Sequence, residues 1–139
     1  MSSAAVDEIG AVLEGWSDAY RAQDVEALLA MGYGDDVQLV GTGADEVRFG
    51  LDEYRVQAER DFSQADEVEM RFTNVHATIV GDAAFAYCDV AVVGTVGGQS
   101  FAAPGLRLTV GLVRTDAGWR FVQTHLSAPA SGQGEGQSF

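Results

Sequence analysis

The sequence contains no lysine, only one cysteine and two prolines, and no long apolar run. Because Cys88 is the single cysteine, an internal disulfide is excluded, and a reducing cytoplasm is the simplest location. The apolar runs are far too short to span a bilayer. No basic stretch followed by an apolar one stands at the N-terminus, so the sequence predicts no signal peptide.

Negative charge dominates the polar residues. With 21 Asp and Glu against eight arginines, the formal net charge is −13. Such a surface repels phosphate backbones and anionic lipid, which argues against nucleic-acid and membrane partners. Two interpretations of the charge remain open, plain solubility and adaptation to high salt, and we favour solubility.

Hydrophobic periodicity predicts three helices in the first half of the chain. Residues 4–22 carry apolar side chains at spacings of three and four, which is typical of an amphipathic helix. Asp24 is suited to be the N-cap of a second, short helix. A third helix is predicted at about 51–63, with one apolar face formed by Leu51, Tyr54, Ala58 and Phe62.

The rest of the sequence predicts strands, at 36–41, 47–49, 68–80, 83–96, 100–115 and 119–127. Gly97-Gly98 signals a tight hairpin, and Pro104-Gly105 signals a bulge or bend. In the last hairpin one alternating set is polar, and it consists of Arg107, Thr109, Gln123 and His125. These four share a face if the turn carries a one-residue bulge at Gly118.

Helices followed by a run of long strands predict an α+β fold rather than an α/β fold. We expect a bent antiparallel or mixed sheet, with the three N-terminal helices packed on its concave face to form a cone. Such a cone often encloses a pocket between helices and sheet. Residues 1–128 are predicted to form this single domain, and 129–139, rich in Gly, Ser and Gln, a flexible tail.

The order of these elements and several short motifs resemble the SnoaL-like branch of the nuclear-transport-factor-2-like superfamily. The motifs are Trp16-Ser-Asp-Ala-Tyr20, Asp24, Gly41-Thr-Gly-Ala-Asp-Glu46, Gly50, Arg107-Leu-Thr109, Gly118-Trp119 and His125-Leu-Ser127-Ala-Pro129. The Gly-Trp turn and the His-x-Ser-x-Pro ending are also similar to the association domain of calcium/calmodulin-dependent kinase. The resemblance covers about residues 5–129 and implies a cone that dimerises through its sheet. Superfamily members include isomerases, cyclases, hydrolases, dehydratases and non-catalytic proteins, so the resemblance does not define an activity.

The steroid isomerase of this superfamily offers a test of chemistry. It uses a tyrosine on the first helix, a base on the first strand and a protonated Asp on the penultimate strand, the last being a standard example of a carboxyl group held neutral. The matching positions here are Trp16, Gly41 and Val110. Gly and Val cannot act as acid or base. We therefore predict that the protein is not a steroid isomerase of that arrangement.

The resemblance to the kinase association domain implies pocket-facing residues on the third helix and in the middle of the sheet, here Tyr54 and Asp89. Tyr87 shares the parity of Asp89. Together with Trp16 and Tyr20, these are the predicted pocket residues. Aromatic residues at such spacing are more often core than ligand contacts, and both interpretations stay open for Trp16, Tyr20 and Tyr54.

Asp89 is the candidate catalytic residue, because it interrupts a strand that should be buried. Lining an apolar pocket would raise the pKa of its carboxyl group toward that of a useful general base. The alternative is a structural Asp that pairs with an Arg or lies at the mouth of the cone.

The remaining polar residues predict no further chemistry. The resemblance places Arg107, Thr109, Gln123 and His125 on the outer face, mainly as interface or structural groups, with a ligand role as the less favoured alternative. Two interpretations of Asp61 remain open, the rim of the pocket and a solvated helix end, and we favour the helix end. The pair Asp45-Glu46 is interpreted as a solvated turn. The sequence has no metal-ligand spacing and no phosphate-binding loop, so no metal or cofactor is predicted.

Two functions remain open. The first is a non-catalytic homodimeric domain that binds a small apolar or mixed-polarity molecule. The second is a cofactor-free acid/base enzyme of isomerase, cyclase, dehydratase or hydrolase type, with Asp89 as the proton-transfer group. Whether the protein is an enzyme is not decided by the sequence.

Overall fold

The helices and strands form close to where the periodicity predicts them. The computed structural model describes residues 3–139. Its elements are α1 (Ala4–Arg21), α2 (Val25–Ala30), the 3-10 turn η1 (Gly34–Asp36), β1 (Gln38–Val40), β2 (Val47–Phe49), α3 (Gly50–Gln64), β3 (Glu67–Val80), β4 (Ala83–Val96), β5 (Gln99–Thr115) and β6 (Gly118–Ser127).

Side chains cap the first two helices. The hydroxyl of Ser3 accepts a hydrogen bond from the backbone N–H of Val6 at 3.1 Å. The Asp24 carboxylate accepts one from the N–H of Ala27 at 3.0 Å, which confirms the predicted N-cap. Each cap satisfies a backbone donor that the first helical turn leaves without a partner.

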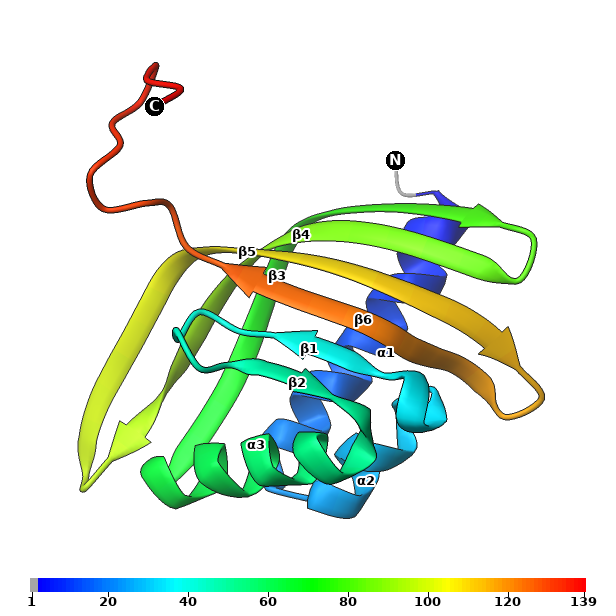
Figure 1. Ribbon diagram of the computed structural model, residues 1–139, viewed down its shortest axis with the longest axis horizontal. Helices are drawn as coiled ribbons and strands as arrows, with labels where there is room; N and C mark the ends of the chain where they lie inside the picture. Colours follow the sequence, from blue (N-terminus) through cyan, green and yellow to red (C-terminus); the bar gives the residue numbers. More distant parts are fainter. Residues whose placement is uncertain (1–2) are drawn as a thin grey trace.

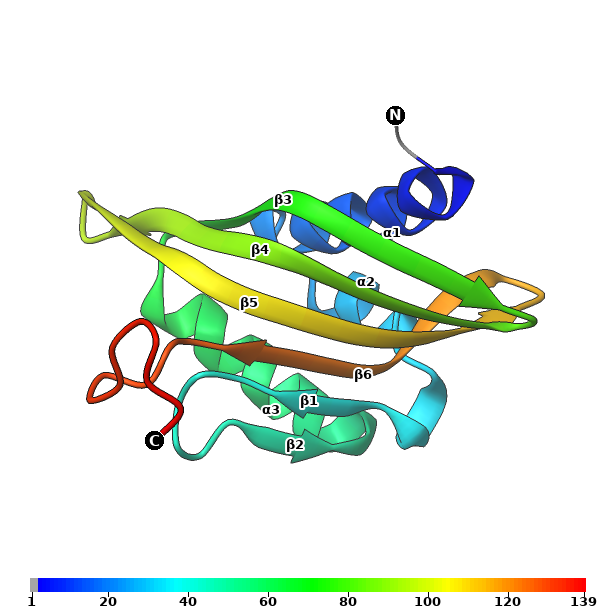
Figure 2. The ribbon, with the colours of Figure 1, turned by 90° about the horizontal axis from the view of Figure 1, so that it is seen from above.

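Six strands form one curved sheet in the order β2-β1-β6-β5-β4-β3, and the three helices lie on its concave side (Figure 1). All neighbouring strands are antiparallel except β1 and β6, which are parallel. The sheet does not close into a barrel. Seen from above, α1 lies along β3 (Figure 2), whereas α3 packs beside β2 (Figure 1). The predicted α+β cone with a mixed sheet is therefore confirmed.

Bulges set which side chains share a face. One extra residue on β5, at Pro104-Gly105, separates the pairs Val90–Leu106 and Val92–Ala103, as predicted. The bulge predicted at Gly118 is wrong. Thr115 pairs directly with Gly118 across a tight turn, and the extra residue of β6 is Val122. The shared face is still the predicted one, because Thr109 pairs with His125 on the far side of this bulge.

The inner face of the sheet packs against the helices. The core is built from side chains of α1, such as Ile9 and Leu13, and of β5 and β6, such as Leu108 and Phe121. Buried Ser17 fastens α1 to β3, because its hydroxyl donates to the Met70 carbonyl at 2.8 Å and accepts from the Met70 N–H at 3.1 Å. This packing fixes α1 as one wall of the space inside the cone.

After β6 the chain is exposed throughout residues 128–139, where turns but neither helices nor strands are found. The flexibility of this tail stays a prediction. Among residues 3–139 no helix combines the length and apolar character needed to cross a membrane.

Candidate functional site

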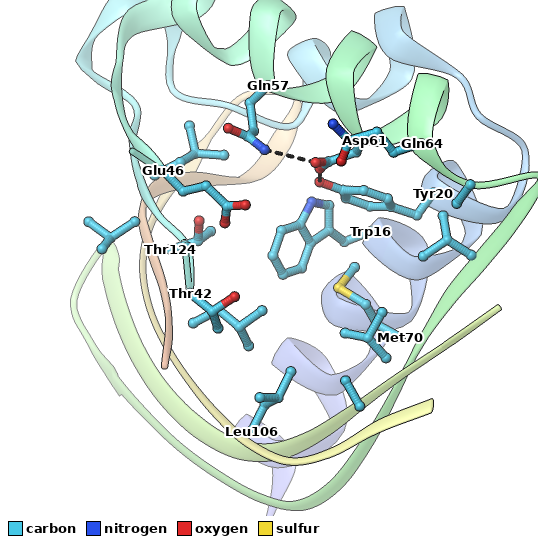
Figure 3. Close-up of a pocket in the computed structure, with 18 of the residues that line it drawn as sticks. Trp16, Tyr20, Thr42, Glu46, Gln57, Asp61, Gln64, Met70, Leu106 and Thr124 are labelled. Carbon is cyan, nitrogen blue, oxygen red and sulfur yellow. Dashed lines mark hydrogen bonds between the residues drawn. The ribbon is translucent and has the colours of Figure 1, made fainter. Parts of the chain in front are cut away.

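A cavity of about 440 Å³ lies between the inner face of the sheet, α1, α3 and the β1–β2 loop (Figure 3). Its apolar wall comes from the sheet, and consists of Val68, Met70, Val92, Val96, Phe101, Ala103, Leu106 and Leu126. A second set of lining side chains is polar, and we call it the polar end: Tyr20, Glu46, Arg48, Gln57, Asp61, Gln64 and Thr124. This division suits a molecule with both apolar and polar parts.

A continuous chain of hydrogen bonds crosses the polar end from β2 to α1. Arg48 Nε donates to Gln57 Oε1 at 3.2 Å, and Gln57 Nε2 donates to Asp61 Oδ1 at 2.8 Å. The Tyr20 hydroxyl donates to Asp61 Oδ2 at 3.1 Å. Gln57 and Asp61 meet because residues four apart lie on the same face of a helix. These three hydrogen bonds hold the Asp61 carboxyl group at the cavity wall.

The electrostatic environment of Asp61 is unusual for a carboxyl group. Burial raises its pKa above the usual value, and the hydrogen bonds from Gln57 and Tyr20 oppose that rise only in part. The negative charge of Glu46 adds to the increase. Burial and the neighbouring Asp61 also raise the pKa of Tyr20 well above its usual value, so Tyr20 stays a hydroxyl donor at neutral pH. Tyr20 and Asp61 thus place a hydroxyl donor and a carboxyl group of raised pKa side by side at the cavity wall.

Glu46 reaches the cavity from the β1–β2 loop. Its Oε1 accepts a hydrogen bond from Arg60 at 3.2 Å. Its carboxylate lies against the backbone of Gly41, where an added Cβ would clash with it. Gly43 gives further room on the same side. Because Gly41 and Gly43 have no side chain, the Glu46 carboxylate fits against the backbone there. A larger residue at position 41 would displace it.

Trp16 forms the middle of the α1 wall. Its indole N–H donates to the Tyr54 hydroxyl at 3.3 Å, and its ring packs at a tilt against Phe121 with centroids 5.2 Å apart. Tyr54 is only 2% exposed and does not line the cavity. Burial raises the pKa of Tyr54 to about 12. Trp16 and Tyr20 thus line the cavity, whereas Tyr54 supports Trp16 from behind.

Asp89 and Tyr87 do not face the cavity, contrary to the prediction. The buried residues of this part of β4 are Ala84, Ala86, Cys88 and Val90, so the odd-numbered side chains point to the convex face. There the Tyr87 hydroxyl donates to Asp89 Oδ1 at 2.5 Å, and Asp89 lies opposite Arg107 on β5. The prediction chose the wrong face because both faces of β4 carry aromatic or aliphatic side chains.

The predicted interface residues lie together on this convex face. Arg107, Thr109, Gln123 and His125 are all exposed. Gln123 Nε2 donates to Gln38 Oε1 at 2.8 Å, and an Arg107 N–H donates to the Ala128 carbonyl at 3.3 Å. Their role as interface or structural groups stays a prediction.

Most of the polar end was not predicted from the sequence, and Asp61 and Glu46, which were expected to be solvated, line the cavity. Gln57, Asp61 and Gln64 recur at spacings of four and three, a polar stripe beside the apolar face of α3. That stripe was the available signal for Asp61. No comparable local signal marks Glu46 or Arg48, which enter the site only through the fold of the β1–β2 hairpin. Within residues 3–139, no three His, Cys, Asp or Glu side chains stand close enough together to hold a metal ion.

Residues 9–131 match the sequence profile of the family described as SnoaL-like domain, which confirms the resemblance found in the motifs. None of the curated proteins compared with the chain is significantly similar to it in sequence.

Solved structures share the fold at low sequence identity. A candidate dehydratase of the NTF2-like family from Streptomyces avermitilis is 21% identical with a TM-score of 0.80, over 91% of this chain and 96% of the other. A candidate aromatic ring hydroxylase from Novosphingobium aromaticivorans is 18% identical with a TM-score of 0.80, over 91% and 90%. A candidate calcium/calmodulin-dependent protein kinase II association domain from Xanthomonas campestris is 18% identical with a TM-score of 0.79, over 89% and 87%. These similarities establish the fold alone.

Proposed function

Because the chain belongs to the SnoaL-like domain family, we propose that it binds a small molecule of mixed polarity in the cavity between helices and sheet. The observation that carries this proposal is the division of the cavity into an apolar wall and a polar end. Its volume, about 440 Å³, falls within the range of ligand pockets.

The two tryptophans make a test possible without a known ligand. Trp16 lines the cavity, whereas Trp119 lies outside it, held by its indole N–H to the Glu8 carboxylate. In an NMR screen of small molecules, a ligand of the cavity should shift the indole N–H signal of Trp16 and leave that of Trp119 in place. A Trp16→Phe variant assigns the two signals.

A matched pair of variants separates cavity binding from surface binding. Ala103 lines the cavity, and its neighbour Ala102 is exposed. Ala103→Phe fills part of the cavity and should abolish the Trp16 shift, whereas Ala102→Phe should preserve it. Equal binding by both variants would refute the proposed site.

A second candidate function is acid/base catalysis, with Asp61 in place of Asp89. It is favoured by the buried setting of Asp61, which raises its pKa, and by the hydroxyl that Tyr20 directs at it. Two of the structural relatives are named as dehydratase candidates, a reaction class that transfers protons in this way.

Hydrogen exchange tests this second function. Carbonyl compounds found in the screen are incubated with the protein in D₂O, and deuterium at the carbon beside the carbonyl group is followed by NMR. Asp61→Asn should abolish catalysed exchange, and Asp89→Asn should not. Exchange that survives Asp61→Asn would exclude Asp61 as the proton-transfer group.

The proposed binding domain is a homodimer that pairs through the convex face of the sheet. Phe85 and Phe49 are 60% and 58% exposed on that face, which favours burial against a second copy. Phe85→Glu should convert the dimer to monomer in analytical ultracentrifugation. Val56→Glu, at an exposed apolar position on α3, is the control. The cytoplasmic location stays a prediction.

A further inference from the structure

One oxygen of the Glu46 carboxylate has no partner in the described part of the chain. Oε1 is taken by Arg60, while Oε2 lies beside Gly41. An ionised carboxylate accepts hydrogen bonds at both oxygens. Oε2 is therefore free to accept from a molecule in the cavity.

Thr124 adds an independent and more buried group. It lies on the inner face of β6, lines the cavity and is only 5% exposed. Its hydroxyl makes no hydrogen bond to any residue in the range 3–139, and on the sheet Thr124 lies between Leu39 of β1 and Val110 of β5, whose side chains offer no polar atom. Among residues 3–139 no fully buried side-chain N or O atom lacks a partner, so the Thr124 hydroxyl is open to the cavity and available to a ligand there. The hydroxyl points into the cavity near Glu46 (Figure 3).

Asp61 contacts only neutral donors, Gln57 and Tyr20. Across the described chain it forms no ion pair: the Gln57 side chain lies between it and Arg48, and the Arg60 charge acts on it only from a distance. Asp61 and Glu46 face the same space above the Trp16 ring (Figure 3). The polar end thus offers three acceptor groups that a ligand can use, and two of them are carboxyl groups.

We infer that the ligand carries a protonated amine on an apolar body, with the amine held by Asp61, Glu46 and Thr124. This inference rests on the proposed binding function and specifies its ligand class. An ammonium group has three donors, which matches the three acceptors. The rings of Trp16 and Tyr20 attract cations, and the net charge of −13 raises the local concentration of cations around the protein.

Three compounds with the same ring test the charge preference: 2-phenylethylamine, 2-phenylethanol and phenylacetate. Affinity is measured from the Trp16 indole signal, with Trp119 as the internal reference. A hydrogen bond between charged groups contributes enough that the amine should bind about tenfold or more tightly than the alcohol. The carboxylate should bind most weakly.

Two pairs of variants locate the preference. Glu46→Gln and Asp61→Asn should each bring the amine down to the affinity of the alcohol, whereas Glu14→Gln, on the exposed face of α1, should change nothing. Gly41→Ala should act like Glu46→Gln, because the new Cβ displaces the carboxylate. Gly10→Ala is its control, since an added Cβ there meets nothing within 4 Å.

Binding of 2-phenylethanol distinguishes the proposed binding function from the inferred preference for an amine. Equal affinity for amine and alcohol, or a preference for phenylacetate through Arg48, would overturn the inference while the binding function stands. Binding of the amine that persists in both Glu46→Gln and Asp61→Asn would overturn it as well. If none of the three compounds shifts the Trp16 signal at millimolar concentration, both claims fail. An unchanged Trp119 signal verifies that each variant is folded.

Discussion

The hydroxyl of Tyr20 on α1 donates to the carboxyl group of Asp61 on α3, with the two oxygens 3.1 Å apart. The sequence separates these residues by the helix α2, the 3-10 turn η1 and two strands, yet both line the polar end of the cavity. The ring of Tyr20 is held edge-on between Trp16 and Phe62, with centroids 5.9 and 5.5 Å away. That aromatic packing orients the hydroxyl toward Asp61.

Removing the Tyr20 hydroxyl should raise the pKa of Asp61 further. The hydrogen bond from Tyr20 stabilises the ionised carboxylate and so lowers the pKa of Asp61. When Tyr20→Phe removes it, less opposes the increase in pKa that burial causes. Titration of the Asp61 carboxyl carbon by NMR measures the change. Phe62→Leu is the control for altered aromatic packing, and a pKa that falls in Tyr20→Phe would contradict the assignment.

The raised pKa of Asp61 should also appear in the pH dependence of stability. The folded protein holds this proton to a higher pH than the unfolded chain, whose carboxyl titrates near 3.8. The contribution of Asp61 to the free energy of unfolding is therefore fully present below pH 3.8 and is lost as the pH rises through the folded pKa. Denaturant unfolding of Asp61→Asn should lack this fall, and exposed Asp52→Asn should retain it. Parallel curves for wild type and Asp61→Asn would be inconsistent with a raised pKa.

Ser17→Ala should destabilise the fold by about 1–3 kcal/mol, because both the N–H and the carbonyl of Met70 lose their side-chain partner in a buried site. Thermal or denaturant unfolding measures the loss. Ser63→Ala removes a hydroxyl that is exposed on α3 and should have little effect. Equal stability of the two variants would mean that Ser17 does not fasten α1 to β3.

The thiol of Cys88 should be inert in the folded protein. It is 1% exposed on the inner face of β4, and burial raises its pKa to about 12. Because the thiolate is the reactive form, modification by a thiol reagent at neutral pH should follow the rate of unfolding. Denaturant should release the single thiol to rapid reaction. Fast modification without denaturant would show that β4 opens locally.

Side-chain periodicity predicts the helices and strands because it is a local property of the chain. The stripe of α1, the N-cap Asp24 and the hairpin glycines 97 and 98 each act within a few residues. The choice of face on β4 is different. Phe85, Ala86 and Tyr87 place apolar side chains on both faces of β4. The sequence pattern therefore does not show whether Cys88 or Asp89 points to the inner face. Only the packing of α1 and α3 on one side decides it.

The sequence by itself determined the α+β order, the long hairpins, the acidic surface and the resemblance to a family. The tertiary structure decided which residues share the cavity, because Tyr20, Glu46, Asp61 and Thr124 come from four separate elements. Their proximity depends on two features. The bulge at Val122 shifts the following side chains of β6 by one position, and the missing side chain of Gly41 leaves room for the Glu46 carboxylate. Such effects arise from contacts between distant segments, and no local pattern in the sequence contains them.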